Sequence, residues 1–501
     1  MTSRRLALAA LLGCAACATN RPVSRPASAA YDPLGGSANW AEFRTAHFIL
    51  DTDAPDDQVG LMLTQLEKLR AGDLQVLAGG DVELPGHIRV FAPSSLPGIF
   101  SEVARDWNEI FYTRGPYSEP VLLAPVSWFL EEPEAVAHEL AHAVSYYLFP
   151  EQPRWFAEGI SQFVQTLASK GGESLILSRD SQVRHASFPP ASVGGLPEGF
   201  LLFSSDLGMP GADLINWQGE DETESYRMFS WLLYHWLWNT RGPALTAFQK
   251  QLANGEDPRK VWLANFPDLD SSDAGQMEAL DAELFAYRRE GKFVMARIEA
   301  KFEYKVEYQP VSPAEVRLWL LRLRQEKPQK KEERLQVRRR ELAKARAEDP
   351  ANPWVQLQQA SFEGKFTPET ARATAQGAPE DFRGWYALSL ASTDPAEKEK
   401  AARKAVELGK ECAACNNQLA WILATSGRAK EALVFADRAL DLAPWDASAI
   451  ETLAEVAVQV GKCPQAVQLQ TRAARMEISA GQPKEASEAR LEALKARCAG
   501  K

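Results

Sequence analysis

Polar and apolar positions alternate in the first part of the chain and follow a helical period in the rest. Residues 43–52 and 87–93 alternate, which predicts two strands, and residues 57–77 between them predict a helix. Residues 110–126 predict one or two further short strands around a Gly-Pro turn. Beyond residue 252 the pattern is helical throughout. The chain therefore predicts an α+β domain followed by an all-α region.

Two helices are predicted after the last of these strands. The first begins at Pro133, with acidic residues in its first turn, carries an apolar face and ends at Pro150. The second runs from Pro153 to about Leu167. Together, these two helices carry most of the candidate metal-binding and catalytic residues of the chain.

The first helix contains the pattern H-E-x-x-H. Its four-residue spacing places His138 and His142 on one helix face, where both imidazoles can reach one ion, and Glu139 lies beside them. Glu158, in W-F-A-E-G on the second helix, follows His142 by sixteen residues and supplies a third ligand. Three protein ligands and one open position suit a catalytic zinc ion, one per chain. The alternatives are a surface helix with two solvated histidines and a degenerate site that kept its motif.

These motifs resemble those of the gluzincin zinc metallopeptidases, specifically the peptidase MA-like group of bacterial envelope proteins. The resemblance covers residues 40–252 and includes a later Y-x-x-x-S helix beginning at Tyr226. It implies an N-terminal mixed β-sheet, a helical zinc-binding part, ligands His138, His142 and Glu158, and Glu139 as the general base. Residues 121–126 are the expected edge strand for binding the substrate backbone.

The resemblance also extends to residues around the ligands. Tyr226 is the first candidate to stabilise the oxyanion, and His235 is the second, although a core histidine is the favoured interpretation of His235. The family often has an acidic residue four positions after the ligand glutamate, and here that position is Gln162. His47 and His87 are interpreted as strand-associated residues without a metal-binding role. The irregular residues 171–222 are a hypothetical lid, in which Arg184 and His185 are interpreted as solvated.

The N-terminus has the form of an export signal. Residues 1–17 combine a basic start with a short apolar stretch and a lipobox-like sequence ending at Cys14, with Cys17 as a second acceptor for lipid. An ordinary cleaved signal is the alternative. Residues 18–37 predict a flexible tether, and residues 38–300 the metallopeptidase domain. We therefore expect an exported protein in the bacterial cell envelope, bound to the membrane only through its lipid.

Composition adds a limit on partners. The 501 residues carry a net charge of −11, which argues against general nucleic-acid binding. Residues 275–300 predict an amphipathic helix that closes the domain. Residues 301–378 predict a charged helical connector with a degenerate repeat, and its run of Arg, Lys and Glu is interpreted as a solvated helix pair.

The C-terminal residues 379–501 repeat with a period of thirty-four. This period is typical of tetratricopeptide repeats, which stack helix pairs into a surface for a peptide or a protein partner. A structural appendage without a ligand is the alternative. The repeated positions are Leu419, Ala420, Gly427, Ala432 and Ala439, which recur as Leu453, Ala454, Gly461, Ala466 and Ala473.

Four cysteines lie in this region, and in an oxidising compartment they can pair in three ways. Cys463 begins a helix and Cys498 ends the predicted capping helix, so these two can meet, which leaves Cys412 with Cys415. A zinc knuckle is a weaker alternative, because the spacing does not match a zinc ribbon.

The whole pattern predicts a zinc metallopeptidase that hydrolyses peptide bonds. Two other functions stay open: a non-catalytic envelope scaffold that binds partners through its repeats, and a zinc hydrolase that acts on a non-peptide amide or ester.

Overall fold

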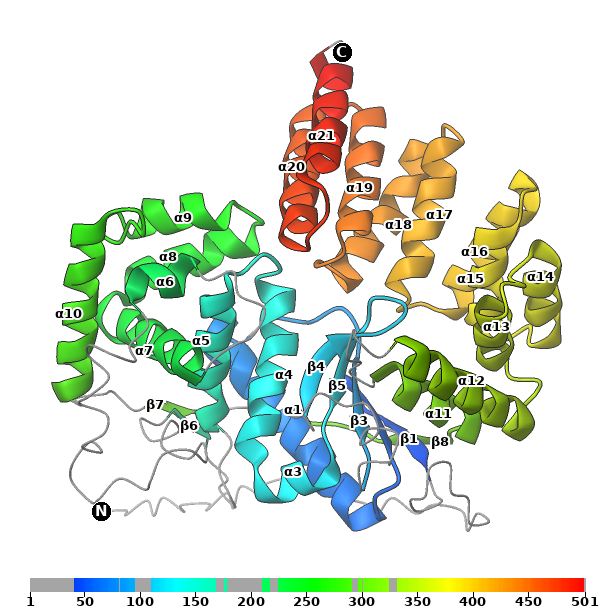
Figure 1. Cartoon of the computed structure of the whole chain (residues 1–501), viewed down its shortest axis with the longest axis horizontal. Helices are drawn as coiled ribbons and strands as arrows, with labels where there is room; N and C mark the ends of the chain where they lie inside the picture. The colour runs from blue at the N-terminus through cyan, green and yellow to red at the C-terminus, as the bar shows by residue number, and fades with distance from the viewer. Residues whose placement is uncertain are drawn as a thin grey trace, which may run out of the picture.

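A mixed sheet of six strands forms the centre of the N-terminal half (Figure 1). The pairs β4/β5, β1/β2 and β1/β8 are antiparallel, and β2/β3 and β3/β5 are parallel. In spatial order the strands are β4 (Phe111–Arg114), β5 (Pro120–Leu123), β3 (Ile88–Ala92), β2 (Phe48–Thr52), β1 (Ala41–Arg44) and β8 (Glu307–Pro310).

This computed structural model describes part of the 501-residue chain. The predicted signal peptide, the tether, Cys14, Cys17, Arg184 and His185 lie outside the described residues. The described ranges are 40–80, 82–94, 110–167, 175–177, 210–216, 224–290, 296–299, 301–323 and 331–499.

The sheet differs from the sequence prediction in three places. The single strand predicted over residues 43–52 is a hairpin, because Thr45 closes a turn by accepting the Phe48 backbone N–H on its hydroxyl. The strand predicted at the edge, β5, lies inside the sheet, and β4 forms the edge instead. The last strand, β8, comes from residues 301–378, which the sequence assigned to a connector.

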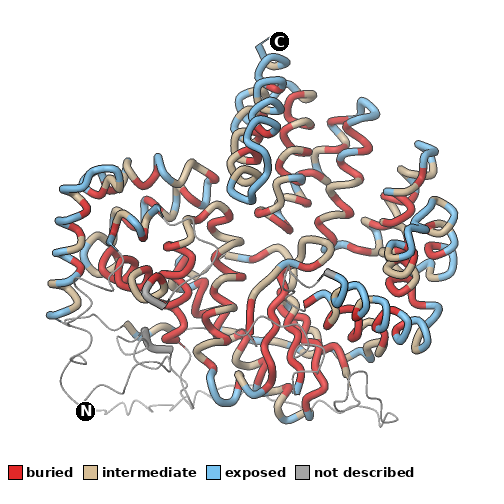
Figure 2. Tube along the Cα trace, viewed as in Figure 1, coloured by how far each residue is buried: buried red, intermediate tan, exposed pale blue. Residues whose placement is uncertain are grey.

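Helices cover both faces of the sheet, and alternate strand residues contact each layer. Leu50, Val90 and Leu122 point into a core shared with α1 (Asp56–Ala78) and α4 (Pro133–Leu148). Phe91, Phe111, Val121 and Leu123 point to the other face, against α11 (Pro313–Leu323), α12 (Lys331–Glu348) and α13 (Pro353–Phe362). Figure 2 shows that the strands of this sheet are mostly buried. The two-residue period of the strands thus builds two cores.

A helical part follows α4 and packs around an aromatic core. Trp155, Phe156, Phe248 and Trp262 contact one another mostly edge to face within it. The helix predicted over residues 275–300 ends at Glu290, and Ala296–Ile298 instead form β7, which pairs with β6 (Leu175–Leu177). The other helices are α3 (Val126–Glu131), α5 (Arg154–Val164), α6 (Gly211–Asn216), α7 (Glu224–Thr240), α8 (Gly242–Ala253), α9 (Pro258–Asn265) and α10 (Ala274–Glu290).

The C-terminal region is a series of antiparallel helix pairs that arches over the end of the sheet (Figure 1). Buried alanines hold the pairs close, among them Ala432, Ala436 and Ala466. Disulfides join Cys412 to Cys415 and Cys463 to Cys498. The helices are α14 (Pro368–Gly377), α15 (Phe382–Ala391), α16 (Pro395–Leu408), α17 (Ala413–Thr425), α18 (Ala429–Leu442), α19 (Ala447–Gln459), α20 (Cys463–Ser479) and α21 (Lys484–Ala499).

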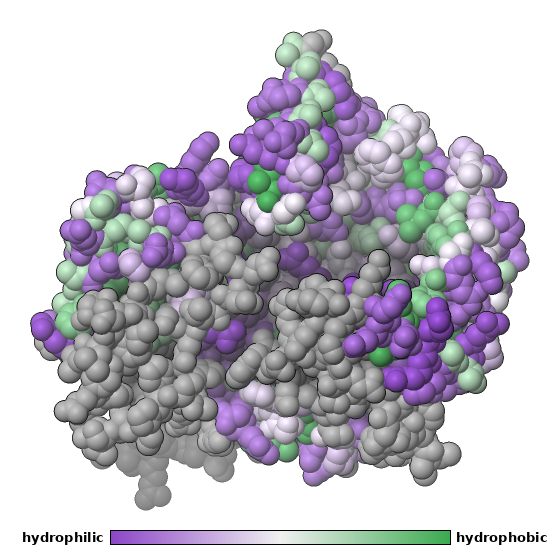
Figure 3. Space-filling model, in the orientation of Figure 1, coloured by the Kyte–Doolittle hydropathy of each residue, from purple (hydrophilic) through white to green (hydrophobic). Residues whose placement is uncertain are grey.

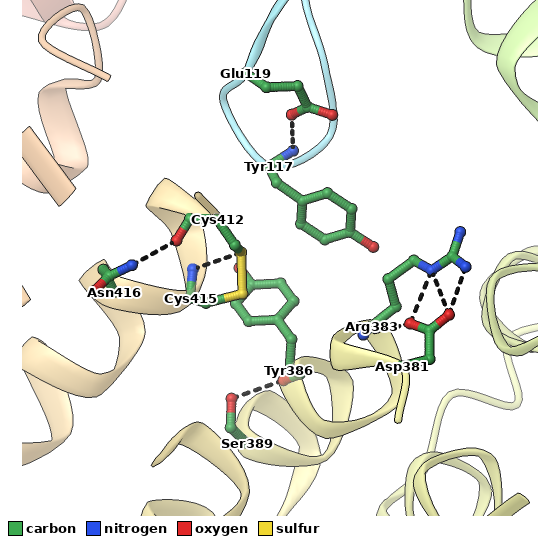
Figure 4. The surroundings of a disulfide bond; sticks show 9 residues. All are labelled: Tyr117, Glu119, Asp381, Arg383, Tyr386, Ser389, Cys412, Cys415 and Asn416. Carbon is green, nitrogen blue, oxygen red and sulfur yellow. Dashed lines mark hydrogen bonds and ion pairs between the residues drawn. A yellow bond between two sulfur atoms is a disulfide. The ribbon is translucent and has the colours of Figure 1, made fainter. Parts of the chain in front are cut away.

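The turn between β4 and β5 lies against this helical array. Tyr117 packs edge-on against Phe382 and Tyr386. Figure 4 shows Tyr117 and Tyr386 beside the Cys412–Cys415 disulfide. Ser118, the one described non-glycine residue with positive φ (68°), donates its hydroxyl to Asp446 and accepts the Trp445 indole N–H. A turn beside the edge strand is therefore held by the repeats.

Two further surface properties concern the predicted partners. The visible face of α12 is hydrophilic (Figure 3), but Arg317 of α11 is buried and pairs with Glu341 and Glu348 of α12, so the helix pair predicted to be solvated is exposed only in part. No helix among the described residues combines the length and the apolar character needed to cross a bilayer.

Candidate metal centre

Helix α4 presents the two histidines of the H-E-x-x-H pattern side by side. Pro133 stands at its start and Glu134 in its first turn, both favourable positions. The opposite face of the helix is buried by Val136, Leu140 and Val144. The packing of that face fixes the rotation of the helix, so His138 and His142 point together toward α5.

Three potential ligand side chains converge at this point. The Nε2 atoms of His138 and His142 are 3.2 Å apart. Glu158, from α5, places Oε1 3.1 Å from His142 Nε2 and Oε2 3.7 Å from His138 Nε2. Within the described residues, this is the only group of three His, Cys, Asp or Glu side chains arranged to hold a metal ion.

The spacing of these atoms fits a tetrahedral zinc ion. Zinc binds His nitrogen at about 2.0–2.1 Å and carboxylate oxygen at about 2.0–2.2 Å, so neighbouring ligand atoms lie about 3.3–3.5 Å apart. The 3.2 Å between the two Nε2 atoms is close to this value, and each imidazole has a different Glu158 oxygen nearby, Oε1 at 3.1 Å from His142 and Oε2 at 3.7 Å from His138. His138 and Glu158 are buried, and the His142 side chain is 12% exposed, which makes it the most accessible of the three.

Glu139 is held beside the cluster by the edge strand. Its Oε2 accepts the backbone N–H of Tyr112 in β4 at 2.8 Å. Burial raises the pKa of Glu139, whereas the His142 charge and the Tyr112 N–H oppose this rise. The hydrogen bond also fixes the distance between β4, the outermost strand of the sheet in the described residues, and the face of α4 that carries His138 and His142.

An amide pair supports His138 from behind. Gln165 places Oε1 3.1 Å from His138 Nδ1, so Nδ1–H donates to it and Nε2 remains available to a metal. The Gln165 amide nitrogen donates in turn to Oε1 of Gln162. Gln162, at the position where the family often has an acid, thus acts on the histidine through Gln165.

Glu158 is charged under most conditions. Burial alone would raise its pKa, but the hydrogen bond to His142 and the charges of His142, His138 and Arg227 hold the pKa well below the usual range of a glutamate. Arg227 Nε lies 3.8 Å from Glu158 Oε2. Arg227 is therefore a cation at the site that the sequence analysis did not single out.

A close helix contact sets the position of Glu158. A Cβ atom added to the next residue, Gly159, would lie 2.6 Å from the Ser230 carbonyl oxygen and 2.8 Å from the Tyr234 Cβ. Only glycine lets α5 and α7 approach this closely. The glycine of W-F-A-E-G therefore has a packing role next to the ligand.

The two candidates for oxyanion stabilisation lie on α7. Tyr226 is fully buried on the same helix face as Ser230 and Tyr234, the face that contacts α5. His235 lies in the core, where its Nδ1 is 2.7 Å from the Tyr287 hydroxyl and burial lowers its pKa to about 4. His235 is accordingly a packed core histidine, and Tyr226 stays a prediction.

The remaining histidines of the described residues form ion pairs. His47 Nδ1 lies 2.6 Å from Glu67 Oε2, and His87 Nδ1 lies 2.7 Å from Glu411 Oε2. The second pair joins the sheet to the helical array. Neither belongs to a three-ligand cluster of the described residues.

Comparison with known proteins relates the chain to helical-repeat structures. No protein-family model matches the chain, and no curated protein matches it. A thermophilic TPR protein of Thermus thermophilus is similar at 16% identity and TM-score 0.27, over 36% of this chain and 96% of its own. Yeast Tom70 is similar at 15% identity and TM-score 0.28, over 74% of each chain. At these TM-scores neither likeness carries information on the candidate metal cluster.

Proposed function

We propose that this chain is a zinc-dependent peptidase of the gluzincin type. The observation that carries the proposal is the convergence of His138, His142 and Glu158 at zinc spacing, with a further carboxylate, Glu139, beside them. Zinc held by these three residues would supply a water molecule whose pKa is lowered toward neutrality. Glu139 would be the general base, accepting a proton at a carboxylate oxygen and holding it for the leaving nitrogen.

The substrate would bind along the free edge of β4. An edge strand offers unpaired backbone groups to which an extended peptide can add. Glu139 is hydrogen-bonded to Tyr112 in the middle of β4, so a peptide on this edge passes the proton-transferring carboxylate. Arg227 and Tyr226, at the start of α7, are the residues we assign to charge stabilisation.

Metal analysis tests the proposal directly. Purified protein is expected to contain about one zinc per chain, and Glu158→Ala to lose it. Peptide-library cleavage by the wild type, absent in Glu139→Gln at unchanged zinc content, would establish hydrolysis. Protein that takes up no zinc when zinc is supplied would exclude the metallopeptidase. Cleavage of amides or esters but no peptides would indicate the non-peptide hydrolase.

A second candidate function is a scaffold that binds protein partners through the repeats. It is favoured by two exposed apolar side chains, Leu390 of α15 and Trp421 of α17, on neighbouring helices that the Gln418–Ser389 hydrogen bond joins. Partner binding that persists in a zinc-free Glu158→Ala protein would support this function.

With either function, we propose export to the cell envelope and lipidation at Cys14 or Cys17.

A further inference from the structure

An exposed cation ends the edge strand beside the candidate site. Arg114 is the last residue of β4. Its guanidinium carbon lies 5.6 Å from the centre of the Tyr146 ring and 5.3 Å from the centre of the Trp445 ring. Tyr146 belongs to α4, and Trp445 belongs to the turn between α18 and α19. The two halves of the molecule therefore hold one arginine between them.

The position of Tyr146 relates this arginine to the metal cluster. His138, His142 and Tyr146 follow one another at four-residue intervals, so they lie on one face of α4, each about 6 Å further along the helix axis. The Tyr112 ring stacks on Tyr146 with ring centres 5.9 Å apart, and the Tyr112 N–H binds Glu139. Arg114 thus stands two strand residues beyond the point where β4 meets the site.

No carboxylate of the described residues forms an ion pair with Arg114. Arg114 also interacts with the Tyr112 hydroxyl. Burial raises the pKa of Tyr112 to about 12, and Arg114 opposes this rise. The two acids of the adjacent turn have other partners: Glu119 accepts the Tyr117 N–H and Asp446 accepts the Ser118 hydroxyl. The cation therefore lacks a neutralising acid within the described part of the chain.

The geometry leaves the hydrogen-bond donors of this arginine for a ligand. Aromatic rings contact the flat faces of a guanidinium, whereas its N–H groups point outward in the plane. A planar carboxylate accepts two of these N–H groups at once. If Arg114 served only to connect α4 to the repeats, its contacts with the two rings would be sufficient and its guanidinium would not need to be exposed.

We propose that Arg114 is a specificity-determining residue that binds a carboxylate of the substrate, and that Trp445 of the repeats positions it. The inference rests on the proposed peptidase function for its substrate. A peptide paired with β4 has the same rise per residue as the strand, about 3.3–3.4 Å. Because Arg114 is two residues beyond Tyr112, the substrate carboxylate should lie about two peptide residues from the one opposite Tyr112. It is supplied either by a Glu or Asp side chain or by the terminal carboxylate of the peptide.

Matched peptides test this inference by two readouts. The probes are alanine-based octapeptides, blocked at both ends, in which one Glu or one Gln is moved through every position, and the same all-alanine peptide with a free C-terminus. Cleavage by the wild type gives kcat/KM, and fluorescence anisotropy with labelled peptides gives binding to Glu139→Gln. At one position we expect a preference of about tenfold or more for Glu over Gln, as expected for a charge-assisted pair.

Variants then assign the preference to Arg114. Arg114→Glu should reverse it, Arg114→Lys should retain part of it, and Trp445→Leu should weaken it, all at unchanged zinc content. Arg241→Glu is the matched control, because Arg241 also stacks on a tryptophan, Trp236, but pairs with Asp268, which follows α9 and lies away from β4. This control should keep the wild-type preference.

The outcomes separate the two carboxylate sources and the two proposals. Preference among blocked peptides indicates a side chain, and preference only for the free C-terminus indicates the terminal carboxylate. Arg114-dependent binding without cleavage would refute the peptidase and retain the carboxylate subsite. Equal ratios in wild type and Arg114→Glu, by both readouts and with both peptide sets, would overturn the inference, as would the absence of any peptide binding.

Discussion

Gln165 orients His138, a candidate metal ligand, with an amide where a carboxylate is a common partner. Its Oε1 accepts the Nδ1–H of His138, so the tautomer that offers Nε2 to the metal is fixed. Loss of such a partner typically weakens metal binding by about 10–100-fold. We expect this loss in Gln165→Leu, whereas Gln165→Glu should bind zinc at least as tightly as the wild type because a carboxylate accepts the same hydrogen bond more strongly.

Competition with a chromophoric zinc chelator measures both affinities. Gln152→Leu is a suitable control, since Gln152 is also buried but bonds Ser145, about two helical turns along α4 from His138. Zinc affinity in Gln165→Leu equal to that of the wild type would show that the Gln165 contact does not support the ligand.

Asp73 is the second residue whose environment makes a prediction. It is fully buried in α1, both carboxylate oxygens have no hydrogen-bond partner among the described residues, and burial raises its pKa well above 3.8. A group with a raised folded-state pKa opposes folding increasingly as pH rises above its unfolded-state pKa. Asp73→Leu should therefore be more stable than the wild type by about 1–3 kcal/mol near neutral pH.

Thermal unfolding at pH 4 and pH 7 tests this. The advantage of Asp73→Leu should be larger at pH 7, where the unfolded wild type gains the most from ionising Asp73. A variant that is less stable than the wild type at both pH values would indicate a stabilising role for the carboxyl group.

The sequence revealed the residues whose chemistry depends on local spacing and missed those that depend on tertiary contacts. His138, Glu139 and His142 are fixed by helix periodicity, and the structure brings Glu158 to the two histidines. Gln165, Arg227 and Arg114 carry no local signal. Their positions follow from the packing of α4 against α5, α7 and β4, which no spacing within one element specifies.

At the scale of elements, the approach of α5 to α7 decides where the third ligand lies. Gly159→Ala places a methyl group against the Ser230 carbonyl and must push the helices apart. We expect a loss of about 1–3 kcal/mol in stability, as for overpacked cores. Because Glu158 is the adjacent residue, zinc affinity should also fall.

A second helical glycine provides the control. A Cβ at Gly60 in α1 meets nothing within 4 Å, so Gly60→Ala should be neutral or stabilising. Chemical denaturation and zinc titration of both variants make the comparison. If Gly159→Ala kept the stability and the zinc affinity of the wild type, α7 would be able to shift away from the added methyl group without displacing Glu158.

Element prediction failed where pairing partners decide the structure. The period-two pattern of residues 43–52 is the same for one strand and for a hairpin, and the turn is made by a Thr45 hydroxyl bond. Likewise, the apolar run of β5 reflects burial inside the sheet, whereas the more polar β4 forms its edge. The alternation identified strands, but strand order depends on contacts far apart in the sequence.

For the whole molecule, the thirty-four-residue period predicted the repeats but not their contact with the sheet. That contact depends on individual side chains of the β4–β5 turn and on Trp445, Asp446 and Glu411. Its consequence is that the array acts on the edge strand of the candidate site. The repeats are therefore part of the architecture of the candidate site.

One of these contacts makes the docking of the repeats dependent on pH. His87 donates from Nδ1 to Glu411 and from Nε2 to the Thr45 carbonyl at 3.0 Å, an arrangement that requires the protonated ring. The Glu411 hydrogen bond raises the pKa of His87 above 6.5, while burial and the Arg44 charge oppose it. The stabilisation is fully present below about pH 6.5 and is lost as pH rises through the raised pKa.

Hydrogen exchange at the start of α17 and thermal unfolding, both between about pH 5.5 and 8.5, measure this dependence. The wild type should be more stable than His87→Gln at about pH 6, and the difference should shrink as the pH rises through the raised pKa of His87. At low pH the stabilisation from this pair is lost because Glu411 becomes protonated. Burial alone would raise the pKa of Glu411, but His87 holds it below the usual value, so this loss begins only at acidic pH. A stability difference that stayed constant across this range would mean that the pair holds the repeats without titrating, and any pH dependence of their docking would then have to come from other groups at the contact.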